Sequence, residues 1–181
     1  MNKKRLLAIL IPIFILLAMT IIPISTLAFG TEILLETRPV DPRDLFRGDY
    51  VILSYKIEEI ELSKFDKALQ EKLVTQMIGS FPQNKNLYVI LKKHENGTHV
   101  VDYVSENKPS SNKLYMKGKF NHFLYQEPSA EARIMVSYNI DKYFVPENTG
   151  MELEEAARKG EVLAKVKLFK GYAMLTELII P

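Results

Sequence analysis

The first part of the chain is an apolar run without a charged side chain. No Asp, Glu, Lys or Arg occurs in residues 6–31, where Leu, Ile, Phe and Ala predominate. A helix of about 20 apolar residues is enough to cross the hydrocarbon core of a membrane. The pattern therefore predicts a membrane anchor over residues 1–30, in contact with lipid through residues 6–29, and one domain over residues 31–181.

Three cations precede the apolar run and predict its orientation. Lys3, Lys4 and Arg5 are the only charges before Glu32, and positive charges remain preferentially on the cytoplasmic side. We therefore expect a single-pass protein of the cell membrane, with its N-terminus cytoplasmic and its domain extracytoplasmic. The alternative is a signal peptide cleaved after Thr26-Leu27-Ala28, but the run exceeds the usual apolar region of about 7–15 residues, which favours an uncleaved anchor.

Alternation of apolar and polar positions predicts the first strands of the domain. Residues 32–36 form one expected strand, and residues 50–57 form a second in which successive side chains point to opposite faces. Tyr50, Ile52, Ser54 and Lys56 share one face of this second strand. The other face is apolar, and we expect it to lie in the core: Val51, Leu53, Tyr55 and Ile57.

The rest of the chain alternates between strand and helix patterns. A helix is expected to begin at Ser63 and end before Gly79, with an apolar residue at every fourth position, and a short acidic helix is expected over residues 151–159. Turn signals at Asn96-Gly97 and Lys170-Gly171 predict two hairpins. The remaining strands are expected at 87–93, 99–105, 114–120, 162–168 and 172–180. Residues 132–145 are expected to form another strand or a bent pair of strands. The predicted class is α+β: a single transmembrane helix, then a mainly antiparallel β domain with two or so covering helices.

Two five-residue segments resemble each other. Leu-Ser-Tyr-Lys-Ile at residues 53–57 is echoed by Val-Ser-Tyr-Asn-Ile at residues 136–140. Five positions do not establish an internal repeat, so the similarity remains an observation at this point.

Charge and composition exclude several classes of protein. Without Lys3, Lys4 and Arg5, the chain has 21 basic and 22 acidic residues, a net charge of −1. Nucleic-acid binding requires a basic face, so a nucleic-acid partner is not expected. The chain has no cysteine, which excludes disulfides, thiolate catalysis and zinc sites with cysteine ligands. No cofactor motif occurs, and no cofactor is expected.

Acidic residues and histidines are the remaining candidates for chemistry. Asp41, Asp44 and Asp49 lie close together, but their spacing fits no calcium loop, and pairing with the nearby arginines accounts for them. His94 and His99 flank the Asn96-Gly97 turn and could both contact one metal ion, although the sequence supplies no third ligand. We therefore interpret the acids as turn and ion-pair residues and the histidines as a solvated hairpin end.

The segment before the second strand carries a recognisable signature. It contains Gly48, Asp49, Tyr50, Leu53 and Tyr55 at the spacing of the GDYxxLxY motif, and it resembles the prokaryotic, membrane-anchored family named for that motif. A second similar block, Tyr-Phe-Val-Pro-Glu-Asn-Thr-Gly, covers residues 143–150. The resemblance implies a single-pass membrane protein with an extracytoplasmic domain that serves a multi-pass membrane partner.

The sequence is compatible with two functions. The first is a non-enzymatic binding or assembly module at the outer face of the membrane. Its partner surface is predicted to consist of Arg43, Asp44, Arg47 and Tyr50, because Tyr and Arg often supply interface energy. The alternative is an envelope hydrolase that uses the acids of the 38–49 loop. Because no catalytic motif is present, the sequence favours the binding module.

Overall fold

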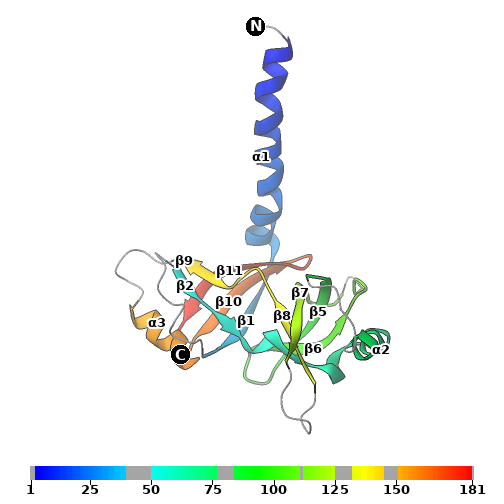
Figure 1. Ribbon diagram of the computed structural model, residues 1–181. Coiled ribbons are helices and arrows are strands. Elements are labelled where there is room, and N and C mark those ends of the chain that lie inside the picture. The colour runs from blue at the N-terminus through cyan, green and yellow to red at the C-terminus, as the bar shows by residue number, and fades with distance from the viewer. Residues whose placement is uncertain are drawn as a thin grey trace.

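The computed structural model consists of one long N-terminal helix and a body of sheets and shorter helices (Figure 1). It describes residues 3–39, 50–76, 84–110, 112–124, 132–144 and 151–180. Helix α1 spans Lys3–Phe29 and projects away from the body, which begins with a strand at Thr31. The predicted α+β class is confirmed: among the described residues, antiparallel sheets, two further α-helices and two short 3₁₀ helices, Lys56–Glu58 and Leu62–Lys64, follow the apolar helix.

Helix α1 has the properties of a membrane-spanning segment. Its stretch Leu7–Phe29 comprises 23 residues and contains an 18-residue window with a mean hydropathy of 2.8, and most of its large apolar side chains are exposed. An isolated water-soluble helix would not present apolar side chains on every side. By length and composition, α1 can cross a membrane.

Eleven strands are found in the described part of the chain. They are β1 (Thr31–Arg38), β2 (Tyr50–Ile52), β3 (Ser54–Tyr55), β4 (Glu59–Glu61), β5 (Asn86–Lys93), β6 (His99–Ser105), β7 (Tyr115–Leu124), β8 (Arg133–Ser137), β9 (Lys142–Phe144), β10 (Leu163–Phe169) and β11 (Tyr172–Ile179). One sheet has the order β11-β10-β1-β3 and another the order β4-β8-β7-β5-β6, while β2 and β9 form a two-stranded ribbon. Every pairing between these strands is antiparallel.

The two predicted hairpins are confirmed, β5–β6 and β10–β11. Their turns contain the positive φ angles that the sequence signals predicted, 87° at Gly97 and 81° at Gly171. Two strands are longer than expected. β1 extends to Arg38, where it pairs with β3, and β7 extends to Leu124, where its far end pairs with β8.

Helices α2 (Lys67–Gln76) and α3 (Met151–Lys159) pack on the sheets. The predicted start of α2 at Ser63 is wrong, because Asp66 is the N-cap: its Oδ1 accepts the Leu69 N–H at 2.9 Å. The Asp66 N–H donates to the Val104 carbonyl at 2.9 Å, so contact with β6 holds the chain before the helix begins. The predicted end at Gly79 lies outside the described residues. The predicted end of α3 at Gly160 is confirmed by a φ of 71°.

The predicted strand over residues 50–57 is interrupted at Leu53 and ends at Tyr55, because Lys56–Glu58 form a 3₁₀ helix. The segment β2 pairs with β9, whereas β3 pairs with β1, so the chain changes partners between them. At the change, the Leu53 N–H donates to the Asp141 carbonyl at 2.8 Å. The predicted orientation is nevertheless confirmed, since each residue of the apolar face is at most 4% exposed: Val51, Leu53, Tyr55 and Ile57.

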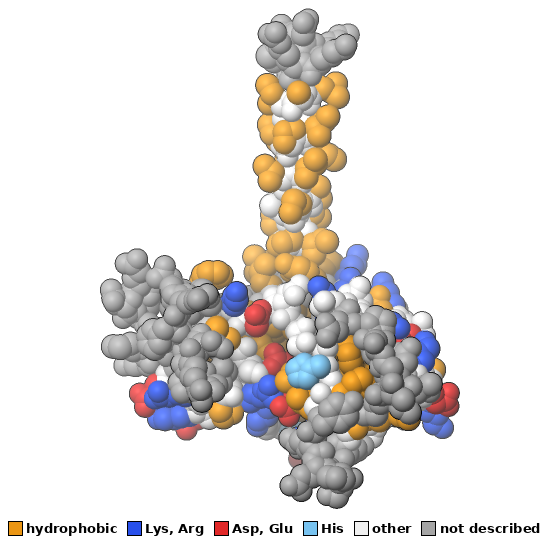
Figure 2. Space-filling model, viewed as in Figure 1, with side chains coloured by type: hydrophobic (Ala, Val, Ile, Leu, Met, Phe, Trp, Pro, Cys, Tyr) orange, Lys and Arg blue, Asp and Glu red, His pale blue; other side chains and the backbone are white. Residues whose placement is uncertain are grey.

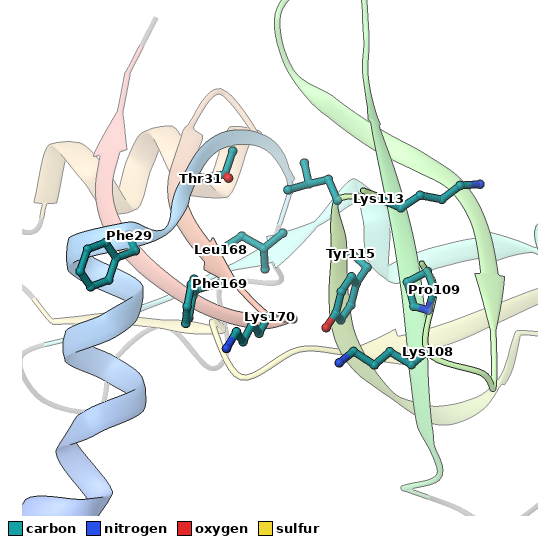
Figure 3. Close-up of a pocket in the computed structure, with 11 residues that line it drawn as sticks. Phe29, Thr31, Lys108, Pro109, Lys113, Tyr115, Leu168, Phe169 and Lys170 are labelled. Carbon is teal, nitrogen blue, oxygen red and sulfur yellow. The ribbon is translucent and has the colours of Figure 1, made fainter. Parts of the chain in front are cut away.

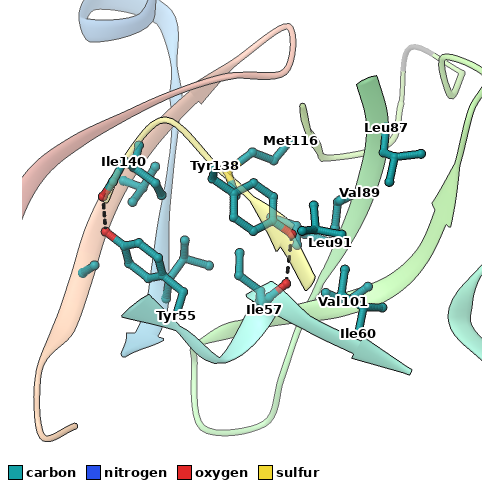
Figure 4. Close-up of a cluster of buried hydrophobic side chains, with 14 of the residues drawn as sticks. Tyr55, Ile57, Ile60, Leu87, Val89, Leu91, Val101, Met116, Tyr138 and Ile140 are labelled. Atoms are coloured by element: carbon teal, nitrogen blue, oxygen red, sulfur yellow. Dashed lines mark hydrogen bonds between the residues drawn. The ribbon is translucent and has the colours of Figure 1, made fainter. Parts of the chain in front are cut away.

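The two segments with similar sequences face each other in the core. The Tyr55 hydroxyl donates to the Ile140 carbonyl at 2.6 Å, and the Tyr138 hydroxyl donates to the Ile57 carbonyl at 2.9 Å (Figure 4). Each tyrosine therefore bonds to the isoleucine that lies two residues after the other tyrosine. Burial raises the pKa of both hydroxyls, so both remain protonated donors. The echo in the sequence thus corresponds to a reciprocal contact.

The sheets show the same reciprocal arrangement as these two segments. In one sheet β1 lies between the strand that ends at Tyr55 and the hairpin β10–β11; in the other, β7 lies between the strand that precedes Tyr138 and the hairpin β5–β6. The first half of the chain, β1–β6, therefore supplies the hairpin β5–β6 to the sheet that contains β7. The second half, β7–β11, supplies the hairpin β10–β11 to the sheet that contains β1. The helices follow the same plan, because α2 and α3 each precede one of these hairpins.

Candidate functional site at the base of helix α1

Helix α1 is joined to the body by one residue, Gly30. The Gly30 N–H donates to the Thr26 carbonyl at 2.9 Å, and a Cβ at this position would lie 2.3 Å from that oxygen. On β10, the Lys167 Nζ donates to the Leu27 carbonyl at 2.5 Å. A cation at a helix C-terminus satisfies free carbonyls and the helix dipole. The chain therefore passes from the last turn of α1 into β1 through one residue, and the Lys167 side chain forms a hydrogen bond between β10 and the end of the helix.

The turn between β10 and β11 is held close to this junction. The Gly171 carbonyl accepts the Lys117 N–H at 2.9 Å, which ties the turn to β7. A Cβ on Gly171 would lie 2.4 Å from the Tyr115 ring, so only glycine permits this approach. Tyr115 is itself held by an edge-on contact with Tyr88, with ring centroids 5.7 Å apart.

A hollow of about 670 Å³, the helix-base cleft, lies between this turn, the end of α1 and the loop before β7 (Figure 3). Loop 106–114 supplies Lys108 and Lys113, and the β10–β11 turn supplies Lys170. The remaining lining residues are Phe29, Thr31, Pro109, Leu114, Tyr115, Leu168, Phe169 and Gly171. The cleft therefore combines ammonium groups with aromatic and aliphatic surface.

An adjoining hollow of about 500 Å³ extends along α1. Its apolar side is formed by Ile21 and Ile22 of the helix, and Lys117 of β7 adds another cation. It shares four residues with the helix-base cleft: Lys108, Tyr115, Phe169 and Lys170. The two hollows are therefore adjacent parts of one surface.

The cations of this surface have no acidic counterparts in its lining. Neither hollow is lined by Asp or Glu. Within the described residues, Lys108, Lys117 and Lys170 form no salt bridge. Figure 2 shows Lys and Arg side chains around the foot of the apolar helix. The arrangement is suited to holding an anion.

Most of the site predicted from the sequence lies elsewhere or is not described. Gly48, Asp49 and the predicted partner residues Arg43, Asp44 and Arg47 lie outside the described residues, as does Asp41. The backbone of Tyr50 begins β2 and pairs with Phe144. The other two signature residues, Leu53 and Tyr55, are core residues, 2% and 0% exposed.

Comparison with known proteins supports the interpretation of the signature. The family model described as GDYXXLXY protein matches residues 12–178, from within α1 to the end of β11. The chain belongs to the GDYXXLXY family. No curated protein and no solved structure matches it.

In this GDYXXLXY protein, the described end of the signature loop carries an ion-pair cluster. Arg38 forms a salt bridge with Glu59, and its Nε donates to Ser54 Oγ at 2.6 Å. The Ser54 hydroxyl donates in turn to Glu58 at 2.5 Å. Burial raises the pKa of Glu58, and the Ser54 hydrogen bond opposes that shift. Arg38 and Glu59 are thus paired with each other, which gives this cluster a structural role at the β1–β3 junction.

The two histidines of the β5–β6 turn do not form the metal site considered above. His94 Nδ1 lies 3.2 Å from Asn96 Oδ1, whereas His99 Nδ1 accepts the Leu34 N–H of β1 at 3.4 Å. Burial lowers the pKa of His99, so it is not a solvated turn residue as predicted. Among the described residues, no group of three His, Cys, Asp or Glu side chains could hold a metal ion.

Sequence reasoning missed the lysines of this surface. Lys108, Lys113 and Lys170 line the helix-base cleft, and Lys117 lines the adjoining hollow. They belong to the loop before β7, to β7 itself and to the β10–β11 turn. No local spacing connects position 170 to the others. The only signal was compositional, because Lys117 and Lys170 belong to segments in which lysines recur near aromatic residues.

Proposed function

We propose that this GDYXXLXY protein is a single-pass membrane protein with a cytoplasmic N-terminus and an extracytoplasmic domain. The domain is a binding or assembly module for a multi-pass protein in the same membrane. The observation that supports the proposal is the one-residue connection between α1 and β1 at Gly30, together with the hydrogen bond from Lys167 of β10 to the end of α1. A connection this short keeps the domain close to the membrane surface and to its membrane neighbours.

The short connection between α1 and the domain favours recognition of another membrane protein. Binding costs free energy when flexible segments must be ordered, and a short rigid connection reduces that cost for a partner held in the same plane. The proposed partner surface is the one predicted from the sequence: Arg43, Asp44, Arg47 and Tyr50. Its two ends are anchored in the sheets, since β1 ends at Arg38 and β2 begins at Tyr50.

The first test concerns topology. We expect protease added to intact spheroplasts to remove the domain, because Lys3, Lys4 and Arg5 retain the N-terminus in the cytoplasm. The measurement is an immunoblot with tags at both ends, and permeabilised cells serve as the control for protease access. Full protection of the domain in intact spheroplasts would show the opposite orientation, and a mature N-terminus at Phe29 would show that α1 is removed.

The second test concerns the partner surface. The double substitution Arg43→Ala and Arg47→Ala is expected to abolish co-purification of the membrane partner from detergent-solubilised membranes. The matched control is Lys64→Ala and Lys67→Ala, which removes the same charge near the start of α2. Thermal melts of all three proteins should agree. A lowered melting temperature with the partner retained would assign the arginines to folding and contradict the proposal.

A further inference from the structure

The surface at the base of α1 brings apolar helix side chains and cations together. Ile21 and Ile22 line the hollow that lies along the helix, and Lys108 and Lys170 line both hollows. Phe169 and Tyr115 are also shared by both hollows. A ligand that fills this surface therefore contacts both apolar side chains and ammonium groups.

The positive charge of the surface is not neutralised from within the protein. The acid nearest to Lys108 along the chain, Glu106, forms salt bridges with Lys72 and Lys85. The acid nearest to Lys170, Glu177, forms a salt bridge with Lys165. Burial alone would raise the pKa of Glu106, but Lys72 and Lys85 lower it, so it remains a carboxylate committed to them. Lys108 and Lys170 therefore lack a carboxylate partner among the described residues and can bind an external anion.

The position along α1 indicates which anion is available. A helix rises about 1.5 Å per residue, so the 23 residues of Leu7–Phe29 extend slightly beyond a hydrocarbon core of about 30 Å. Phe29 and the helix-base cleft then lie at the level of lipid headgroups. Ile21 lies eight residues earlier, about 12 Å deeper along the helix, among acyl chains.

We propose that the helix-base cleft and the adjoining hollow together bind one anionic phospholipid of the outer leaflet. Lys108, Lys117 and Lys170 contact the headgroup phosphate, and the Tyr115 hydroxyl donates to it. The acyl chains lie against Ile21 and Ile22 of α1. Lysine and tyrosine are the side chains that typically lie at this level of a membrane, and basic clusters beside a transmembrane helix bind anionic lipids. The inference rests on the membrane insertion of α1 within the proposed function.

The test is lipid selectivity of the full-length chain. The protein is reconstituted into nanodiscs of phosphatidylcholine with a minor fraction of phosphatidylglycerol, then extracted gently, and the retained lipids are quantified by mass spectrometry. We expect phosphatidylglycerol to be enriched. In the Lys108→Ala, Lys117→Ala, Lys170→Ala variant, the enrichment should be lost, so that the retained lipids match the composition of the nanodisc, because the cations that attract the anionic headgroup are absent. The control Lys64→Ala, Lys67→Ala, Lys93→Ala removes equal charge elsewhere and should retain the wild-type enrichment.

The outcomes separate the inference from the proposed function. Failure of the wild-type chain to insert into the nanodiscs would contradict both. Insertion without enrichment, or equal loss of enrichment in both triple variants, would overturn only the lipid site. Displacement of the lipid by low concentrations of inorganic phosphate would also overturn it, because the site would then recognise free phosphate without need of the acyl chains. Thermal melts of the three proteins check that each variant is folded.

Discussion

A chain that ends at Ser110 is expected to remain unfolded, even though it contains α1, β1–β6 and α2. In the whole protein, β5 pairs with β7, which joins the hairpin β5–β6 to its sheet, and β1 pairs with β10. Both pairing partners, β7 and β10, lie after Ser110. Buried residues of β1 and β5 such as Ile33 and Val89 would be exposed, and a two-stranded hairpin is only marginally stable alone.

The experiment compares residues 1–110 with the full chain in the same detergent. Amide hydrogen exchange should show protection throughout β1 and β5 in the full chain and none in the fragment, while α1 remains protected in both. Co-expression of residues 111–181 should restore the protection, because the second half supplies β7 and the hairpin β10–β11. A protected, cooperatively melting fragment 1–110 would contradict the interdependence of the halves.

The substitution Leu53→Ala is expected to lower the free energy of unfolding by about 2–5 kcal/mol. Leu53 is 2% exposed and belongs to the same buried cluster as Val51 and Tyr55. It also lies at the point where the chain changes from β9 to β1 as its pairing partner. Truncation leaves a cavity at this point. The strand pairs β2–β9 and β1–β3 on either side hold the backbone in place, so the cavity cannot collapse. Chemical denaturation of the full chain in detergent measures the loss.

The matched control is Ile52→Ala, one residue earlier on the opposite face. Ile52 is half-buried, so less apolar area is returned to water when its side chain is removed. Its loss should be clearly smaller than that of Leu53→Ala. Equal losses at the two positions would show that both faces of this segment are packed to the same extent, which the burial pattern excludes.

Much of the fold followed from local patterns. The apolar helix was predictable from 26 positions without charge, residues 6–31, and the buried face of residues 51–57 from alternation alone. The turns at Gly97 and Gly171 were predictable because positive φ angles favour glycine. The start of α2 was not, because Ser63 and Asp66 are both acceptable N-caps and the contact of Asp66 with Val104 decided between them.

The sequence by itself determined the apolar helix, the hairpins and the core face of the GDYXXLXY signature, since each depends on periodicity or on backbone preferences within a few residues. Only the tertiary structure decided which hairpin completes which sheet, the reciprocal bonds of Tyr55 and Tyr138, and the gathering of lysines beside α1. Strand pairing joins segments far apart in the chain, and the free energy that selects one pairing comes from burial summed over both partners. A pattern within a few residues does not include the burial free energy of a distant partner, so it cannot predict which strands pair.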